Sequence, residues 1–357
     1  MDMKNNTIDA FLALVRAGLW EKEVRLSAFD RIDYDDIMRL AEEQNVVGLA
    51  TSGLEQVQDL KIPQVVLLQF IGQTLQIEQK NKAMNEFIAK LIKRLRSADI
   101  YTLLVKGQGI AQCYEKPLWR ASGDVDLLLS DSNYYKAKEL LLPLSSGNKP
   151  DERYSKHLGM NIGEWYVEIH GTLRTGLSER VDREVDAVQR DVFYGGKVRS
   201  WENHGVQVFL PAPDEDVFFV FSHFIKHFYK EGMNLRQICD WCRLLWTYQN
   251  AVDGELLKKR IKRAGLMTEW RTFAALAVNW LGIPVEAMPI YYEKENLNEN
   301  YKKKAGRILS FILEGYKQNV VRDTWSIAKI FPCNTIRFIP AIFFNVNGLK
   351  IRERIFG

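Results

Sequence analysis

The stretch that decides the fold is Arg120-Ala-Ser-Gly-Asp-Val-Asp-Leu-Leu-Leu129. Its apolar end is typical of a buried strand, and the side chains of Asp124 and Asp126 would point to the same side of such a strand. Paired carboxylates repel each other unless a cation lies between them, and Mg²⁺ with substrate phosphates suits such oxygen ligands. The stretch therefore indicates a metal-dependent phosphate site, although a solvent-facing strand end can carry the same Asp-x-Asp pattern.

A glycine-containing turn precedes this strand. Residues 101–107 (YTLLVKG) predict a short strand that stops at glycine, and residues 109–114 predict a short helix. Glycines at such a turn let backbone N–H groups approach an anion, and Lys106 adds a positive charge. We therefore expect Lys106, Gly107, Gln108 and Gly109 to hold phosphate, with a plain turn as the alternative.

A third carboxylate lies in Val167-Glu168-Ile169-His170. A carboxylate between β-branched residues in a strand is costly unless it points into a site or finds a partner. Together with Asp124 and Asp126 on adjacent strands, Glu168 would complete a two-metal site for phosphoryl transfer. His170 shares the strand face of Glu168 and is expected either to contact substrate or to make a structural hydrogen bond.

At these residues the chain resembles the nucleotidyltransferase superfamily of the DNA polymerase β type. It is more closely similar to a bacterial nucleotidyltransferase family with a Lys-Gly turn, an Arg-x-x-Gly-Asp-x-Asp segment and a later Glu-x-His strand. The resemblance implies a mixed-sheet core that uses two Mg²⁺ ions and a nucleoside triphosphate. By matching position, Asp124 and Asp126 would bind metal and Glu168 would be the third acid. One departure is Gly107-Gln108, where the superfamily usually has Gly-Ser or Gly-Gly.

Further residues are assigned to the site. Arg120 and Lys106 could neutralise phosphate charge, since guanidinium and ammonium groups both bind phosphate, or either could simply be an exposed cation. The neighbouring Ser122 and Gly123 are expected to contact the nucleotide. The resemblance extends into the following helices, where possible substrate contacts are His227, Arg236 and Asp240.

Hydrophobic periodicity divides the chain into three regions and predicts an α+β fold. Residues 1–97 are expected to be helical, 98–212 to form the nucleotidyltransferase-like α/β core, and 213–357 to be helical again. Within the core, strands are predicted at 101–107, 124–129, 160–162, 165–170, 197–201 and 206–210, with a helix at 134–142. Later helices are predicted at 218–229, 235–248, 255–264, 268–281 and 301–313, and the charged residues 293–304 are expected to form a solvated connection.

Composition excludes several classes of protein. The 357 residues carry a net charge of +4, with 46% hydrophobic and 26% charged residues. That charge does not indicate nucleic-acid binding by itself, although modification of nucleic-acid ends stays open. Four cysteines are too few for a disulfide framework, and no apolar run approaches the ~18 residues of a membrane span. A cytoplasmic protein without a transmembrane segment is expected.

Two alternatives remain at this stage. His223-x-x-x-His227 and Cys239-x-x-Cys242 could together form a tetrahedral zinc site, or could simply belong to a packed helix pair. The protein could also keep the fold and bind nucleotide with little or no catalysis, because of its Gly107-Gln108 turn. The acceptor, the base preference and the oligomeric state do not follow from the sequence.

Overall fold

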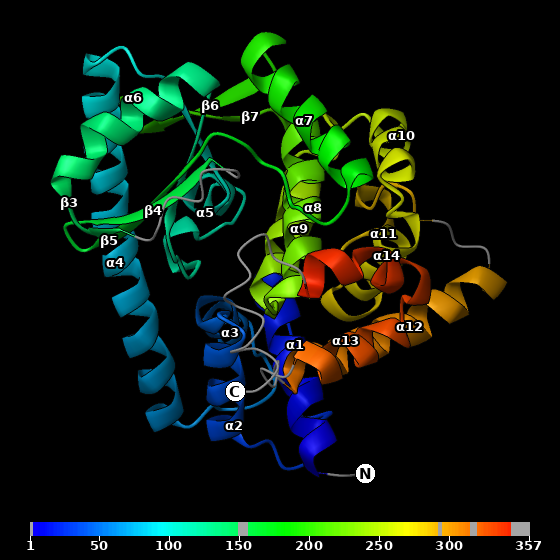
Figure 1. Cartoon of the computed structure of the whole chain (residues 1–357). Helices are drawn as coiled ribbons and strands as arrows, with labels where there is room; N and C mark the ends of the chain where they lie inside the picture. Colours follow the sequence, from blue (N-terminus) through cyan, green and yellow to red (C-terminus); the bar gives the residue numbers. More distant parts are fainter. Residues whose placement is uncertain (1–2, 149–155, 292–294, 315–319, 344–357) are drawn as a thin grey trace.

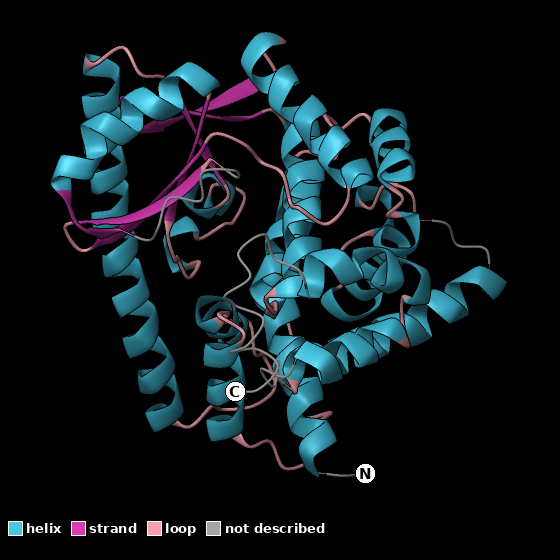
Figure 2. Ribbon diagram, viewed as in Figure 1, coloured by secondary structure: helices cyan, strands magenta, loops and turns pink. Residues whose placement is uncertain are grey.

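The computed structural model describes residues 3–148, 156–291, 295–314 and 320–343, and it combines many helices with one mixed β-sheet (Figure 1). This confirms the predicted α+β class. Figure 2 shows the strands gathered on one side of the molecule, with helices around them and over the rest. Four helices precede the sheet, namely α1 (Met3–Trp20), α2 (Tyr34–Glu43), α3 (Val47–Leu54) and α4 (Gln64–Ser97).

The first helices pack closely because small residues lie where they cross. Helices α1 and α3 are in extensive contact, and a Cβ atom on Gly18 of α1 would lie 2.0 Å from the Leu49 carbonyl oxygen of α3. Glycine is therefore required at this crossing by the approach of the two backbones. Helix α2 begins at a capped turn, since the Asp33 side chain accepts hydrogen bonds from the N–H groups of Asp35 and Asp36.

The sheet contains seven strands in the order β3-β4-β5-β2-β1-β7-β6. Strand β2 is parallel to β5, β1 is parallel to β7, and the other neighbouring pairs are antiparallel. The strands are β1 (Thr102–Val105), β2 (Val125–Leu129), β3 (Ser145–Asn148), β4 (His157–Ile162), β5 (Trp165–His170), β6 (Val198–Asn203) and β7 (Val206–Pro211). Strand β3 at the edge was not predicted, because its residues Ser-Ser-Gly-Asn carry no hydrophobic pattern.

Between the strands lie α5 (Gly107–Ala111), a 3₁₀ turn (Pro117–Trp119), α6 (Asp131–Leu141) with a further 3₁₀ turn (Leu142–Leu144), and α7 (Glu179–Tyr194). The C-terminal half of α4 and helix α6 cover one face of the sheet. They bury an apolar layer with strand residues that include Val125, Leu127, Val167 and Ile169. Because side chains alternate along a strand, Asp126 and Glu168 point to the opposite face.

Helix α4 thus packs on the sheet although it lies before residue 98, where the α/β region is predicted to begin. An amphipathic pattern shows that a helix has a buried face, but it does not show which partner covers that face. In Figure 1 the other half of α4 extends beyond the sheet, beside α2 and α3. There the hydroxyl groups of Thr51 and Thr74 lie 2.7 Å apart in the contact between α3 and α4.

Helices follow the sheet, as predicted. They are α8 (Pro213–Lys230), α9 (Leu235–Thr247), α10 (Gly254–Ala264), α11 (Met267–Leu276) with a π-helical turn (Ala277–Leu281) and a 3₁₀ turn (Val285–Ala287), α12 (Glu295–Leu313), α13 (Val320–Ala328) and α14 (Pro332–Phe343). The expected solvated connection at 293–304 is wrong from Glu295 onward, because α12 begins there. Its apolar side is supplied by later residues such as Ala305 and Ile308, which are fully buried.

No helix in the described ranges is both long enough and apolar enough to cross a bilayer.

Candidate functional site

The register of the sheet brings three carboxylates together. Strand β2 is parallel to β5, and in their register Asp126 lies directly beside Glu168. Asp124 lies two residues before Asp126, at the start of β2. One oxygen from each of Asp124, Asp126 and Glu168 can be chosen so that all three lie within 4.8 Å of one another. The sequence thus places these acids side by side through a pairing between distant segments.

Asp126 is the buried centre of this acidic group. Its side chain is 2% exposed, and one carboxylate oxygen lies 2.8 Å from both Lys106 Nζ and His170 Nε2. Burial opposes its ionisation, but Lys106 and His170 outweigh burial and hold the pKa of Asp126 well below its usual range. Asp126 is therefore ionised at neutral pH.

Asp124 differs from Asp126 in its electrostatic surroundings. The negative charge of Asp126 and burial together raise the pKa of Asp124, and Lys106 opposes this only in part. In the described part of the chain, no cationic side chain lies within ion-pair distance of Asp124. Within the acidic group, Asp126 thus forms an ion pair with Lys106, whereas Asp124 has no such direct partner among the described residues.

Two histidines support the remaining acid. His157 Nε2 lies 3.0 Å from Glu168 Oε2, and His170 Nε2 lies 3.6 Å from the same oxygen. Burial opposes ionisation of Glu168, but the hydrogen bond with His157 outweighs it and lowers the pKa of Glu168. Burial lowers the pKa of His170, although Asp126 opposes this effect. The lowered pKa favours the neutral imidazole.

Lys106 reaches Asp126 from an unusual backbone conformation at the end of β1. Its φ of +60° lies in the left-handed region that side-chain-bearing residues rarely adopt, and Gly107 follows at φ +45°. A Cβ atom on Gly107 would meet the carbonyl oxygen of Asp124 at 3.6 Å, so this turn lies against the acidic strand. Such strained backbone is found most often at functional sites.

The other two residues of the turn face the interior. The Gln108 side chain is 2% exposed and donates a hydrogen bond to Asn81 Oδ1 at 2.7 Å. A Cβ atom on Gly109 would lie 2.7 Å from a methyl carbon of Leu210. The Gln108 side-chain amide thus helps to fix α5 against α4, so a contact of Gln108 with phosphate would have to come from its backbone. Gly109 is needed for packing against β7.

Arg120 and Asp240 form a buried ion pair. The guanidinium donates to both carboxylate oxygens at 2.7 and 2.6 Å, and the two side chains are 5% and 6% exposed. Tyr114 also donates its hydroxyl proton to Asp240, at 2.8 Å. The charge of Arg120 is thus already matched by Asp240. These residues anchor the loop before Asp124 to α9, and the predicted contacts of Arg120 with nucleotide and of Asp240 with substrate stay predictions.

Arg236 remains as a cation near Asp124. Its Nη1 donates to the Ala121 carbonyl oxygen at 2.6 Å, and no carboxylate in the described ranges lies within ion-pair distance of it. Burial and the charge of Arg120 lower the pKa of Arg236. Nearby, the buried hydroxyl of Ser122 and the Nε of Arg236 have no hydrogen-bond partner among the described residues. Gly123 is exposed, with open space beside its Cα.

The two histidines of α8 extend the site on its other side. His223 Nε2 lies 3.4 Å from Lys106 Nζ and 2.9 Å from His227 Nε2, and His227 Nδ1 lies 3.0 Å from Glu231. Burial, together with the charge of Lys106, lowers the pKa of His223 well below its usual value. His227 thus lies next to the acidic site through His223.

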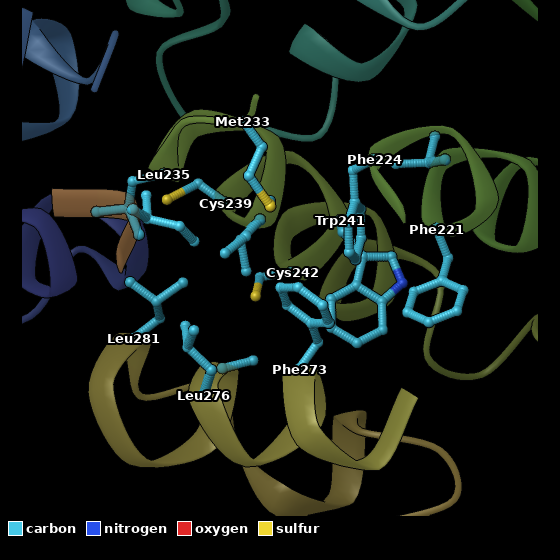
Figure 3. Close-up of a cluster of buried hydrophobic side chains, with 14 of the residues drawn as sticks. Phe221, Phe224, Met233, Leu235, Cys239, Trp241, Cys242, Phe273, Leu276 and Leu281 are labelled. Carbon is cyan, nitrogen blue, oxygen red and sulfur yellow. The ribbon is translucent and has the colours of Figure 1, made fainter. Parts of the chain in front are cut away.

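The predicted alternative of a zinc site is wrong. Cys239 and Cys242 are fully buried, and Figure 3 shows them among the hydrophobic side chains of α9 and α11, including Trp241, Phe273 and Leu276. No possible metal-binding group within the described residues includes either thiol. The histidines face Lys106, whereas the cysteines fill the helical core.

Sequence reasoning missed His157. It lies directly opposite His170 in the antiparallel pairing of β4 and β5, and the two rings stack with centroids 4.6 Å apart. The predicted strand began only at residue 160, so His157 was placed outside it. The available signal was the apolar pair Leu158 and Met160, two residues apart. If they lie on the buried face of a strand, residues 157 and 159 lie on the opposite face, which carries the acids.

The chain matches a protein family and is similar to a solved structure. The comparison with curated proteins finds no match. Among solved structures, the chain is similar to an antigenic nucleotidyltransferase-like protein from Paracoccidioides brasiliensis, with 13% identity and a TM-score of 0.34 over 57% of this chain and 95% of that chain. Residues 30–282 match the family described as uncharacterised nucleotidyltransferase. This match covers both the acidic strands and the helices that support them, and the chain belongs to that nucleotidyltransferase family.

Proposed function

We propose that the protein transfers a nucleoside monophosphate from a nucleoside triphosphate to an acceptor, in a reaction that depends on Mg²⁺. The observation that carries this proposal is the convergence of Asp124, Asp126 and Glu168 within 4.8 Å. In the reaction, an acceptor oxygen or nitrogen bonds to the α-phosphorus while the bond to pyrophosphate breaks. The acceptor's proton passes to water.

The three acids fit a pair of Mg²⁺ ions by charge and by ligand type. All the donors are carboxylate oxygens, which Mg²⁺ prefers. The raised pKa of Asp124, caused first by the negative charge of Asp126, is the mark of like charges held together. When bound by Asp124, Asp126 and Glu168, the ions would supply positive charge to the phosphates and would acidify the attacking group.

The surrounding residues have distinct proposed roles. Lys106 would neutralise phosphate charge if a cation took its place at Asp126, and Arg236 offers a guanidinium that no described carboxylate pairs. The unpartnered Ser122 hydroxyl and the open backbone at Gly123 lie beside Asp124 and offer hydrogen bonds to the nucleotide. The Gly107 turn supplies the close backbone approach. Catalysis would then come mainly from position and charge.

The test measures pyrophosphate release from labelled nucleoside triphosphates with Mg²⁺ and a panel of alcohol, sugar, amine and protein acceptors. Asp124→Asn and Asp126→Asn are expected to reduce the rate by at least about 100-fold, because each removes a charge from the metal-binding set. Asp131→Asn is the matched control, since that aspartate is 74% exposed and pairs with Lys156 at the start of α6.

Each outcome has a definite meaning. Pyrophosphate release that requires both aspartates supports the proposal. Mg²⁺-dependent nucleotide binding without release in any acceptor mixture favours the alternative of a nucleotide-binding protein with the same fold. Absence of nucleotide binding in the wild-type protein would overturn both ideas.

A further inference from the structure

We propose that His157, Glu168 and His170 form a second metal site, one that selects a transition-metal ion such as Zn²⁺ or Co²⁺ over Mg²⁺. The site shares Glu168 with the proposed nucleotidyltransferase centre. It does not depend on nucleotide transfer, because it follows from the arrangement of two imidazoles and one carboxylate.

The strand register builds this site. His157 on β4 is directly opposite His170 on β5, so both side chains lie on the same face of the sheet, and Glu168 lies on that face two residues earlier. The imidazole rings are nearly parallel, with 9° between their planes. Three ligand atoms from two paired strands are therefore held together by backbone hydrogen bonds, which is a rigid support for a metal site.

The distances suit a transition metal. A tetrahedral ion about 2.0–2.1 Å from each ligand atom separates those atoms by about 3.3 Å. The two histidine Nε2 atoms lie 3.0 and 3.6 Å from Glu168 Oε2, and the three ligand atoms all lie within 4.8 Å of one another. The two measured separations, 3.0 and 3.6 Å, lie on either side of this tetrahedral spacing.

The ligand types give selectivity. Imidazole nitrogen suits zinc, cobalt, nickel, iron and copper, whereas Mg²⁺ takes oxygen ligands. Two histidines and one carboxylate leave a coordination position open, as catalytic zinc sites do. The side chains of His157, Glu168 and His170 are 33%, 15% and 16% exposed, so an ion can reach them from solvent.

The site is also linked to the acidic trio. His170 Nε2 lies 2.8 Å from Asp126 Oδ1, and an ion bound at that nitrogen would take the place of this contact. A bound transition metal would therefore free Asp126 from His170. The two proposed sites lie side by side, one with oxygen ligands and one that is mainly nitrogen, with Glu168 available to both.

The experiment uses the full-length protein after removal of metal with EDTA. Titration with Co²⁺ alone is expected to give a visible d–d absorption band of a protein-bound ion, which Zn²⁺ removes and a large excess of Mg²⁺ does not. His157→Ala should abolish the band and weaken Zn²⁺ affinity, measured by calorimetry, by at least about 100-fold. His204→Asn is the matched control, because His204 is exposed in the turn between β6 and β7.

A second variant separates this site from the proposed nucleotidyltransferase centre. Asp124→Asn should keep the Co²⁺ band, because Asp124 is not one of the three ligands. Absence of the band in the wild-type protein, or its persistence in His157→Ala, would overturn the proposal. Loss of the band in Asp124→Asn with retention in His157→Ala would place the ion among the acids and would also overturn it. Failure to release pyrophosphate leaves these readouts unchanged, so the two proposals fail separately.

Discussion

Removal of the carboxylate of Asp240 should destabilise the protein strongly. In the folded state Asp240 accepts two hydrogen bonds from Arg120, and both side chains are almost completely buried. Asp240→Ala leaves the Arg120 guanidinium inside the protein without a counter-charge. It also removes the acceptor of the Tyr114 hydroxyl. Removal of one partner of a buried pair costs about 3–5 kcal/mol, and a buried hydroxyl without an acceptor adds about 1 kcal/mol.

The chain offers a matched control at its surface. Arg174 binds Asp186 with the same two-pronged geometry, at 2.6 to 3.1 Å, but these side chains are 53% and 24% exposed. Water and side-chain entropy reduce the value of such a pair to about 0–1 kcal/mol. Asp186→Ala should therefore change the free energy of unfolding by no more than that, compared with about 4–6 kcal/mol for Asp240→Ala.

Urea denaturation followed by circular dichroism and tryptophan fluorescence measures the difference. A double variant, Arg120→Met with Asp240→Leu, should recover most of the lost free energy, because two apolar side chains need no desolvated counter-charge. The reasoning is refuted if Asp240→Ala costs no more than Asp186→Ala. It is also refuted if the double variant is no more stable than Asp240→Ala alone.

Two further predictions use the same denaturation assay. Gly18→Ala should lower the free energy of unfolding by about 1–3 kcal/mol, because the new Cβ would lie 2.0 Å from a backbone oxygen of α3. Gly72→Ala should raise it by about 0.5–1 kcal/mol, because there is open space at its Cβ. Effects of the same sign would contradict this reasoning. Burial lowers the pKa of His223 below the value of about 6.5 that a histidine has in the unfolded chain. Between these two pKa values the unfolded chain binds more protons than the folded protein, so the free energy of unfolding falls as the pH drops. His223→Gln should therefore lose less stability than wild type between pH values of about 7.5 and 5.5, and equal losses would count against this assignment.

The parts of the fold that depend on local patterns could be predicted from the sequence. The apolar run 125–129 after Asp124 predicted β2, and Pro213 with the acids that follow it predicted the start of α8. Strand β3 lacks any such pattern, and it exists because β4 offers it an edge. The start of α12 was missed for a related reason, since charged residues predict exposure but not the loss of helical backbone.

In the site, residue types were easier to predict than partners. The pattern of Asp124, Asp126 and Glu168 indicated a shared site, and the structure brings the three together. The sequence could not show that Arg120 pairs with Asp240, because the two residues lie 120 positions apart and only the fold brings them together. A charged side chain in a sequence shows only that a counter-charge is needed. Whether a substrate or another side chain supplies it depends on the tertiary fold.

Partners within the protein also explain how three carboxylates can lie close together without disrupting the fold. Lys106 and His170 share one oxygen of Asp126, and His157 supports Glu168, so two of the three carboxylates are matched within the protein. Asp124 is the exception, and its raised pKa records the repulsion that remains. A bound cation would relieve that repulsion and would compete with Lys106 for Asp126. In the proposed reaction the Lys106 ammonium group would then be available to neutralise phosphate charge.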